Sequence, residues 1–131
     1  MAYLKPPWFT VRIFNKVAMI TGISGSETLT VTRRSGGEAQ RIPVLTVVVD
    51  GIRYLVSTRG ESQWVRNIRV TPTVTLATRS GTTDYLAEEI PVDQRERVLA
   101  AYQAKAGKAV EGYFRSLPQA RDHPVFALTP A

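Results

Sequence analysis

The strongest constraint on the fold is the stretch RIPVLTVVVDGIRYLV, residues 41–56. Its β-branched and aromatic residues favour strands on both sides of Asp50 and Gly51. Asp-Gly indicates a two-residue hairpin turn, because both positions accept a positive φ. Pro43 cannot donate a ladder hydrogen bond, so its strand should lie at an edge or carry a bulge there. The unbroken runs VVV and YLV predict strands covered on both faces or closed into a barrel.

Four further segments share this strand-like composition: residues 28–33, 74–79, 83–90 and 125–128. The polar turn SGGEAQ follows the first of them, and Ser80-Gly81 separates the second from the third. Six strands joined mainly by hairpins predict an antiparallel sheet. With few polar positions inside, such a sheet favours a small closed or split β-barrel with helices packed outside.

Apolar residues at helical spacing predict helices over residues 7–22, 61–70, 93–106 and 109–117. Asp93 and Glu96 are spaced as a capping box, so the third helix should begin at Asp93, and Gly107 should end it. Val98, Leu99 and Tyr102 form the apolar stripe of that helix. The first helix is expected to pack on the barrel, although a basic amphipathic helix could also lie on a membrane surface.

The length of 131 residues, without repeats or linkers, indicates a single domain over residues 1–131. The chain has no cysteine and one histidine, which argues against disulfides, thiolate or multi-histidine metal sites and a Ser-His-Asp triad. No apolar run reaches the roughly 18 to 20 residues that span a bilayer, and no signal peptide is evident. We therefore expect a cytoplasmic protein without a metal, with peripheral membrane association left open.

The net charge of +6 indicates an anionic partner. Between residues 33 and 69 there are seven arginines against three acidic residues, a local net charge of +4. Arginine presents a planar fork that matches phosphate or carboxylate with two hydrogen bonds. Nucleic acid, acidic lipid and a phosphorylated small molecule are all compatible with this charge, as is a solvated basic surface.

Two segments in this region could form a binding cleft: residues 33–44 (RRSGGEAQRIPV) and residues 57–67 (STRGESQWVRN). Backbone N–H groups in the glycine-containing turn of the first can approach an oxyanion closely. A helix opening at Glu61 would bring Trp64 and Asn67 onto one face, unless Trp64 belongs to the core. Together they suit a planar ligand with a phosphorylated tail. Nucleic acid is disfavoured because no recognition helix or exposed aromatic sheet is evident.

Residues 29–70 resemble the signature of the deazaflavin-dependent nitroreductases, actinobacterial oxidoreductases that use coenzyme F420 on a split β-barrel similar to the FMN-binding one. The matching elements are R-R-S-G, R-x-P-V, D-G-x-R-Y-L-V and G-E-x-x-W-V-R-N, and the ending HPVFALTP is also typical. The turn SGGEAQR and the short loop TRGESQ differ from the nitroimidazole-reducing members, so the resemblance is to a divergent branch.

The resemblance implies a set of coenzyme-binding residues. The phosphate and acidic tail would be bound by Arg33, Arg34, Ser35, Gly36 and Arg41. The deazaflavin ring would be lined by Pro43, Val44 and Leu45. The edge of the ring pocket and the tail groove would be formed by Ser57, Thr58, Arg59 and Gly60, with the groove shaped by Trp64 and Asn67. The proton donor would be Tyr113, because a tyrosine-bearing segment covers the substrate pocket in some members.

The implied function is hydride transfer from reduced F420 to a small organic acceptor such as a quinone, an enone or a nitro compound. The first alternative is a non-catalytic protein that binds a lipid, a fatty acid or a cofactor on the same barrel. The second, less favoured, is an enzyme that uses FMN. Split barrels often dimerise, so a homodimer is one alternative by analogy, and the sequence leaves the oligomeric state open.

Overall fold

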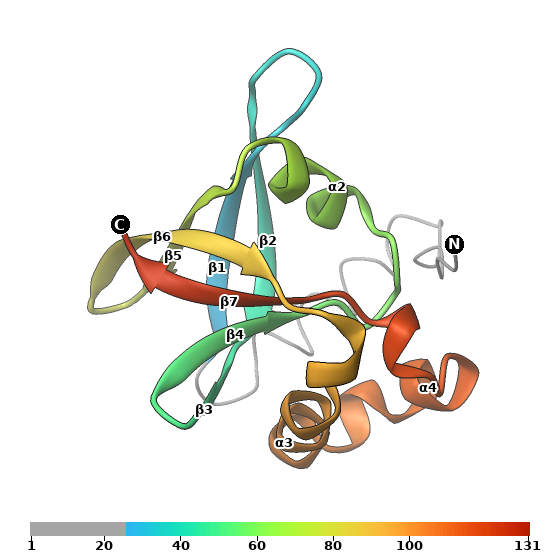
Figure 1. Ribbon diagram of the computed structural model, residues 1–131. Coiled ribbons are helices and arrows are strands. Elements are labelled where there is room, and N and C mark those ends of the chain that lie inside the picture. Colours follow the sequence, from blue (N-terminus) through green and yellow to red (C-terminus); the bar gives the residue numbers. More distant parts are fainter. Residues whose placement is uncertain (1–25) are drawn as a thin grey trace.

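The computed structural model describes residues 26–131, which form one antiparallel sheet of seven strands (Figure 1). The strands are β1 Ser26–Thr32, β2 Ala39–Leu45, β3 Val47–Val49, β4 Ile52–Val56, β5 Thr73–Thr78, β6 Gly81–Glu89 and β7 Val125–Pro130. Their order in the sheet is β2-β1-β5-β6-β7-β4-β3, and every pairing is antiparallel. The sheet curls into a half-barrel, which confirms the predicted fold. The helix predicted over residues 7–22 lies outside the described residues.

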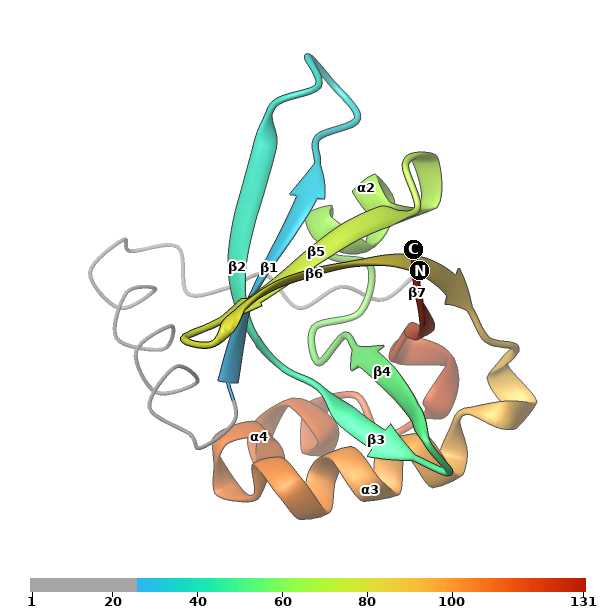
Figure 2. The same ribbon diagram turned by 90° about the vertical axis from the view of Figure 1, so that its left-hand side faces the viewer.

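The single strand predicted over residues 41–50 is broken at Thr46 into β2 and β3. These two strands form the two opposite edges of the sheet, so one continuous segment closes the curl (Figure 2). Pro43 lies in the edge strand β2, as its missing N–H requires. The Asp50-Gly51 turn then joins β3 to β4 with positive φ at both residues, 52° and 79°.

The bend at Thr46 is held by polar contacts from three other elements. The buried Thr46 hydroxyl hydrogen-bonds the carboxylate of Glu27 in β1 at 2.7 Å. The same oxygen lies 2.6 Å from the guanidinium of Arg53 in β4, which also pairs with Glu27 at 3.1 Å. The Lys105 ammonium donates to the Thr46 carbonyl oxygen at 2.6 Å. A buried corner in the backbone thus has its polar groups satisfied.

Among residues 26–131, three α-helices accompany the sheet: α2 Gln63–Val70, α3 Glu96–Ala106 and α4 Lys108–Ser116. Helix α2 packs beside β1, while α3 lies beside β3 and β4 and α4 packs against α3 (Figure 2). Gly107 ends α3 as predicted, and the segment 109–117 is confirmed as helical by α4.

The predicted capping box at Asp93 is wrong. Residues Val92–Gln94 form a 3₁₀ turn, and α3 begins at Glu96 with Arg95 as its N-cap and no side-chain capping bond. The cause is the Arg95 side chain, which is buried and donates to the Ile90 carbonyl oxygen. This contact holds residues 92–94 in the 3₁₀ turn that precedes α3, so Asp93 lies outside the helix.

The core has two parts, one inside the barrel and one between the sheet and α3–α4. Leu55 and Phe126 point into the barrel. Their strand neighbours Tyr54, Val56 and Val125 pack on the other face with the helices. Because both faces of these strands are covered, their sequences are unbroken apolar runs. Within residues 26–131, no helix is long and apolar enough to cross a membrane.

The Asp50-Gly51 turn gives a test of the closing hairpin. Gly51→Ala should lower the free energy of unfolding by about 1–2 kcal/mol, because a side chain is strained at φ 79° although nothing lies within 4 Å of the new methyl group. Gly112→Ala, inside α4 and equally uncrowded, should instead raise it by about 0.5–1 kcal/mol. Urea unfolding monitored by circular dichroism measures both, and equal effects would contradict the assigned turn.

Candidate functional site

A cavity of about 270 Å³ opens between β2, the loop after β4, the start of α2, and α3. Seven of the residues predicted to contact the coenzyme line it: Pro43, Val44, Leu45, Ser57, Thr58, Arg59 and Trp64. The lining includes the cation Arg59 and no carboxylate. Strand β2 pairs only with β1 among the described residues, so the free edge of β2 faces the cavity. The two segments singled out in the sequence therefore do meet in one cleft.

The arginine-rich turn between β1 and β2 is attached to α2 by Asn67. The buried Asn67 side chain accepts hydrogen bonds from the Arg34 backbone N–H at 3.1 Å and from its guanidinium at 2.7 Å. The Asn67 amide donates to Gln40 at 2.8 Å, and Arg34 also donates to Gln63 at 2.7 Å. Gln40 and Gln63 line the cavity, so the turn stands at its mouth. Arg34 and Asn67 hold this turn in place and do not line the cavity themselves.

The other tail-binding candidates lie on the same turn and strand, outside the cavity lining. They are exposed: Arg33, Ser35, Gly36 and Arg41. The guanidinium groups of Arg33 and Arg41 have no partner among residues 26–131, unlike that of Arg34. These two arginines can therefore take an anionic group without breaking an existing contact.

Ser62, which was missed in the sequence, stands at the start of α2. It is the N-cap residue but makes no side-chain capping bond. Its hydroxyl oxygen is the one buried side-chain N or O atom without a partner in the part of the chain that the structure describes, and Ser62 lines the cavity. The first N–H groups of a helix also have no acceptor within it. A serine before a helix is a typical N-cap, but the helix was expected to begin at Glu61.

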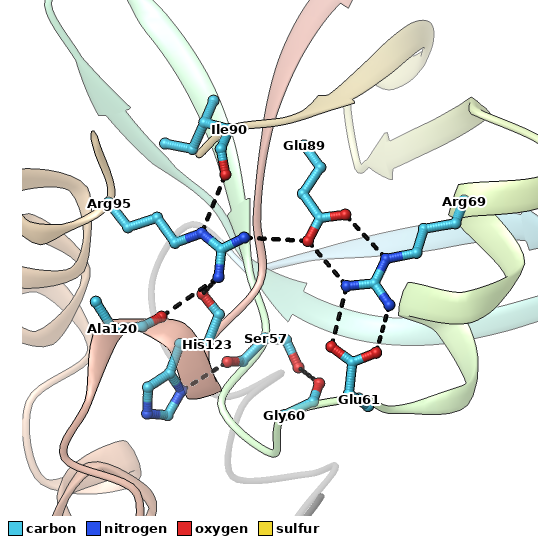
Figure 3. Close-up of polar contacts among 9 residues, drawn as sticks. All are labelled: Ser57, Gly60, Glu61, Arg69, Glu89, Ile90, Arg95, Ala120 and His123. Atoms are coloured by element: carbon cyan, nitrogen blue, oxygen red, sulfur yellow. Dashed lines mark hydrogen bonds and ion pairs between the residues drawn. The ribbon is translucent and has the colours of Figure 1, made fainter. Parts of the chain in front are cut away.

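The loop of residues 57–62 is held in place by hydrogen bonds within it and to residues 123 and 124. The Ser57 hydroxyl donates to the Gly60 carbonyl oxygen at 2.7 Å, and Gly60 is buried with a φ of 81° (Figure 3). The Ser57 carbonyl oxygen lies 2.8 Å from the Nδ1 atom of the fully buried His123. The Ser57 N–H donates to the Pro124 carbonyl oxygen at 2.9 Å. Gly60 therefore shapes the loop and is absent from the cavity lining.

A chain of four charged side chains connects this loop to the rest of the fold (Figure 3). Arg69 in α2 pairs with the buried Glu61 and, at 2.9 Å, with Glu89 at the end of β6. Glu89 also accepts from the buried Arg95 at 3.1 Å. The Arg69 hydrogen bond, opposed by burial, lowers the pKa of Glu89, and burial lowers the pKa of Arg95. The start of α2 is thus anchored to β6 and α3.

Tyr113, the predicted proton donor, lies behind Arg59. The Arg59 guanidinium donates to the Tyr113 hydroxyl at 2.9 Å and lies 5.2 Å from the ring centroid. Tyr113 does not line the cavity, whereas Arg59 does. The structure therefore brings Tyr113 to the loop of residues 57–62 rather than to the cavity wall.

Tyr102 of α3 does line the cavity, although its sequence pattern indicated only a core residue. Its ring packs in the apolar cluster with Phe114, at a centroid distance of 6.3 Å. Burial, with a smaller contribution from Tyr113, raises the pKa of Tyr102 to about 12. No sequence signal distinguishes such a tyrosine from its apolar neighbours in the helix stripe.

Comparison with known proteins identifies the family. Residues 11–129 match the family described as F420H(2)-dependent quinone reductase. The chain belongs to this family. The resemblance to deazaflavin-dependent enzymes is thereby confirmed, over nearly the whole chain. No curated protein matches the chain.

Solved structures show that the fold is shared more widely. An F420-H2-dependent reductase is 22% identical with a TM-score of 0.63, covering 81% of this chain and 95% of its own. A heme storage protein from Vibrio cholerae is 16% identical with a TM-score of 0.62, covering 87% and 86%. A structure described as a domain-swapped dimer is 20% identical with a TM-score of 0.64, covering 95% and 100%. These likenesses establish the split-barrel fold.

The charge chain predicts a specific pH dependence of stability. Because the pKa of Glu89 is lowered from 4.5 in the folded protein, its stabilisation is present above pH 4.5 and is lost as the pH falls through the folded value. Glu89→Gln should therefore lower the melting temperature most at neutral pH and least near pH 3. The exposed neighbour Glu88, changed to Gln, is the matched control. A melting-temperature deficit of Glu89→Gln that stays constant with pH would contradict this assignment.

Proposed function

We propose that the chain is a reductase that takes a hydride from reduced F420 and delivers it to a small organic acceptor such as a quinone, an enone or a nitro compound. Membership of the F420H(2)-dependent quinone reductase family supports the coenzyme. The observation that carries the proposal is the cavity itself, which combines an apolar wall, Arg59, and the unpartnered Ser62 hydroxyl at a helix start. A ligand with a flat ring and an anionic extension satisfies all three.

The size of the cavity indicates that part of the coenzyme would lie outside it, on the protein surface. Small-molecule pockets usually measure about 300–1,000 Å³, and this one measures about 270 Å³. It is therefore too small to enclose the whole of a long coenzyme. The tail would leave past Gln40 and Gln63, toward the arginine turn that Asn67 holds there.

Each group of residues then has a distinct part in binding. Pro43, Val44 and Leu45 would lie along the ring, where the free edge of β2 also offers backbone N–H and C=O groups. Ser62 and the first N–H groups of α2 would bind a polar or anionic group of the coenzyme. The family coenzyme supplies the hydride when bound, while the chain positions it and excludes water.

The remaining tail contacts would come from arginines. Arg33 and Arg41 would bind the acidic tail, since their guanidinium groups have no other partner among the described residues. Arg59 would face the coenzyme from the loop, with Tyr113 holding its guanidinium.

Binding of heme through a histidine receives no support from the described residues. The only histidine, His123, is fully buried, and its ring nitrogens lie 2.8 Å and 2.5 Å from the carbonyl oxygens of Ser57 and Leu117. Binding an iron through it would break contacts that hold the coenzyme loop. A homodimer remains part of the proposal by analogy with the neighbour described as a domain-swapped dimer, and analytical ultracentrifugation tests it.

Titration with oxidised F420, followed by its fluorescence, tests the proposed function. We expect saturable binding below tens of micromolar, with FMN binding more weakly. Arg41→Ala should lower the affinity for F420 by about tenfold or more, because a charge-assisted hydrogen bond is lost. Ser62→Ala should lower this affinity by about three- to tenfold. Neither change should lower the melting temperature. Absence of F420 binding to the wild-type protein would refute the proposal.

Two further variants separate binding from folding. Arg34→Ala should lower the melting temperature, because the Arg34 side chain bonds Asn67 and Gln63, and should weaken F420 indirectly. Arg79→Ala, exposed at the end of β5, should change neither quantity. If Arg34→Ala leaves the melting temperature unchanged, the turn is not held as described. Lipid extraction of the purified protein tests the carrier alternative, which predicts bound fatty acid and no F420 affinity.

A further inference from the structure

The cavity contains one phenol whose hydroxyl has no hydrogen-bond partner in the part of the chain described here. Tyr102 lines the cavity and is 4% exposed. Its ring is held by the apolar cluster that includes Phe114 and Val98. Tyr102 is the one tyrosine of the lining, and no described residue accepts a hydrogen bond from its hydroxyl.

The other polar groups of the lining are unsuited to giving up a proton. The Ser57 hydroxyl already donates to Gly60, and Ser62 and Thr58 are aliphatic alcohols, which hold their protons more tightly than a phenol does. Arg59 keeps its charge because a guanidinium does not deprotonate in proteins. Arg59 and Tyr102 are the only titratable residues of the lining.

The environment also keeps Tyr102 protonated until it is needed. Burial, with a contribution from Tyr113, raises its pKa to about 12, so the phenol is neutral at physiological pH. The titratable groups that share its surroundings are Arg59 in the cavity, Tyr113 of α4, and Tyr54 in the same apolar cluster. No carboxylate lines the cavity to compete for its proton.

We propose that Tyr102, rather than Tyr113, hydrogen-bonds the carbonyl oxygen of the acceptor in this cavity and gives it the proton that completes its reduction. This inference rests on the proposed reductase function and narrows the acceptor to a carbonyl compound such as a quinone or an enone. The acceptor gains a hydride from the reduced deazaflavin and a proton from the phenol. One O–H bond breaks on Tyr102, one forms on the acceptor oxygen, and the phenolate regains a proton from water.

Tyr113 differs from Tyr102 in where its hydroxyl is placed. It accepts a hydrogen bond from Arg59 at 2.9 Å and lies outside the cavity lining. Its contact positions Arg59, so its removal should affect coenzyme binding. Removal of the Tyr102 hydroxyl should affect the acceptor instead. This division of effects makes the two tyrosines distinguishable by experiment.

The first test measures acceptor binding without the coenzyme. In a Trp8→Phe background, Trp64 is the only tryptophan of the chain and lies in the cavity wall, so its fluorescence reports binding of menadione, a simple quinone. Tyr102→Phe should lower the affinity for menadione by about three- to tenfold, which is the effect of one lost hydrogen bond. Tyr85→Phe, in β6 and away from this cavity, is the control and should bind as the parent does. Unchanged menadione affinity in Tyr102→Phe would overturn the proposal.

The second test measures turnover with reduced F420 and menadione. Tyr102→Phe should lower kcat by about 100-fold or more, with F420 affinity unchanged. Its residual rate should rise as the pH falls, since solvent must then supply the proton, whereas the wild-type rate stays level below the phenol pKa. If Tyr113→Phe, and not Tyr102→Phe, shows this pattern, the assignment is reversed and the proposal fails.

A measurement on the wild-type protein covers the case in which Tyr102→Phe does not fold. Infrared difference spectra of bound menadione should show a carbonyl stretch lowered by a hydrogen bond, and an unshifted band would overturn the proposal. If the wild-type protein does not bind F420, the proposed function fails. The menadione titration and the infrared spectra then still decide separately whether Tyr102 binds a carbonyl group.

Discussion

The buried bend at Thr46 is the contact on which the rest of the structure depends. One continuous segment supplies both edges of the seven-stranded sheet, so the sheet must curl until its edges can be joined by a single residue. Glu27, Arg53 and Lys105 satisfy the polar groups of that residue from three elements. A buried corner without these partners would leave unpaired polar groups, which is costly. The same curl leaves one edge of β2 free to face the cavity.

Two parts of the cavity wall, the start of α2 and the loop at Ser57, are held in place by contacts from other elements. The chain of charges from Glu61 to Arg95 ties the start of α2 to β6 and α3, and His123 holds the loop at Ser57. Sites supported in this way keep their geometry during binding. Among residues 26–131, the buried Ser62 hydroxyl has no hydrogen-bond partner, and both Ser62 and Tyr102 line the cavity. Unmet hydrogen-bonding capacity is thus concentrated where a ligand would lie.

The sequence predicted the fold well where local signals were strong. The Asp50-Gly51 hairpin, the edge position of Pro43 and the helix end at Gly107 all follow from backbone restrictions of single residues. The break at Thr46 could not be predicted, because its cause is a set of partners distant in the chain. The misplaced helix start at Asp93 has the same origin, since Arg95 makes its contacts with residues up to 28 positions away.

For the site, the sequence and the family resemblance located the two segments that form the cleft. They did not show which residues of these segments line the cavity and which hold the turn in place. Asn67 and Arg34 hydrogen-bond each other and hold the turn. Ser62 and Tyr102 are recognised as cavity residues only from the three-dimensional structure. The arrangement also limits how this protein can diversify. Within residues 39–49, which close the barrel, Gln40 and residues 42–45 also line the cavity, so substitutions at those positions alter stability and ligand fit together. The loop before α2 and the inner face of α3 also line the cavity but contribute no strand to the sheet. Preference for new acceptors can therefore evolve from those two elements while the barrel stays unchanged.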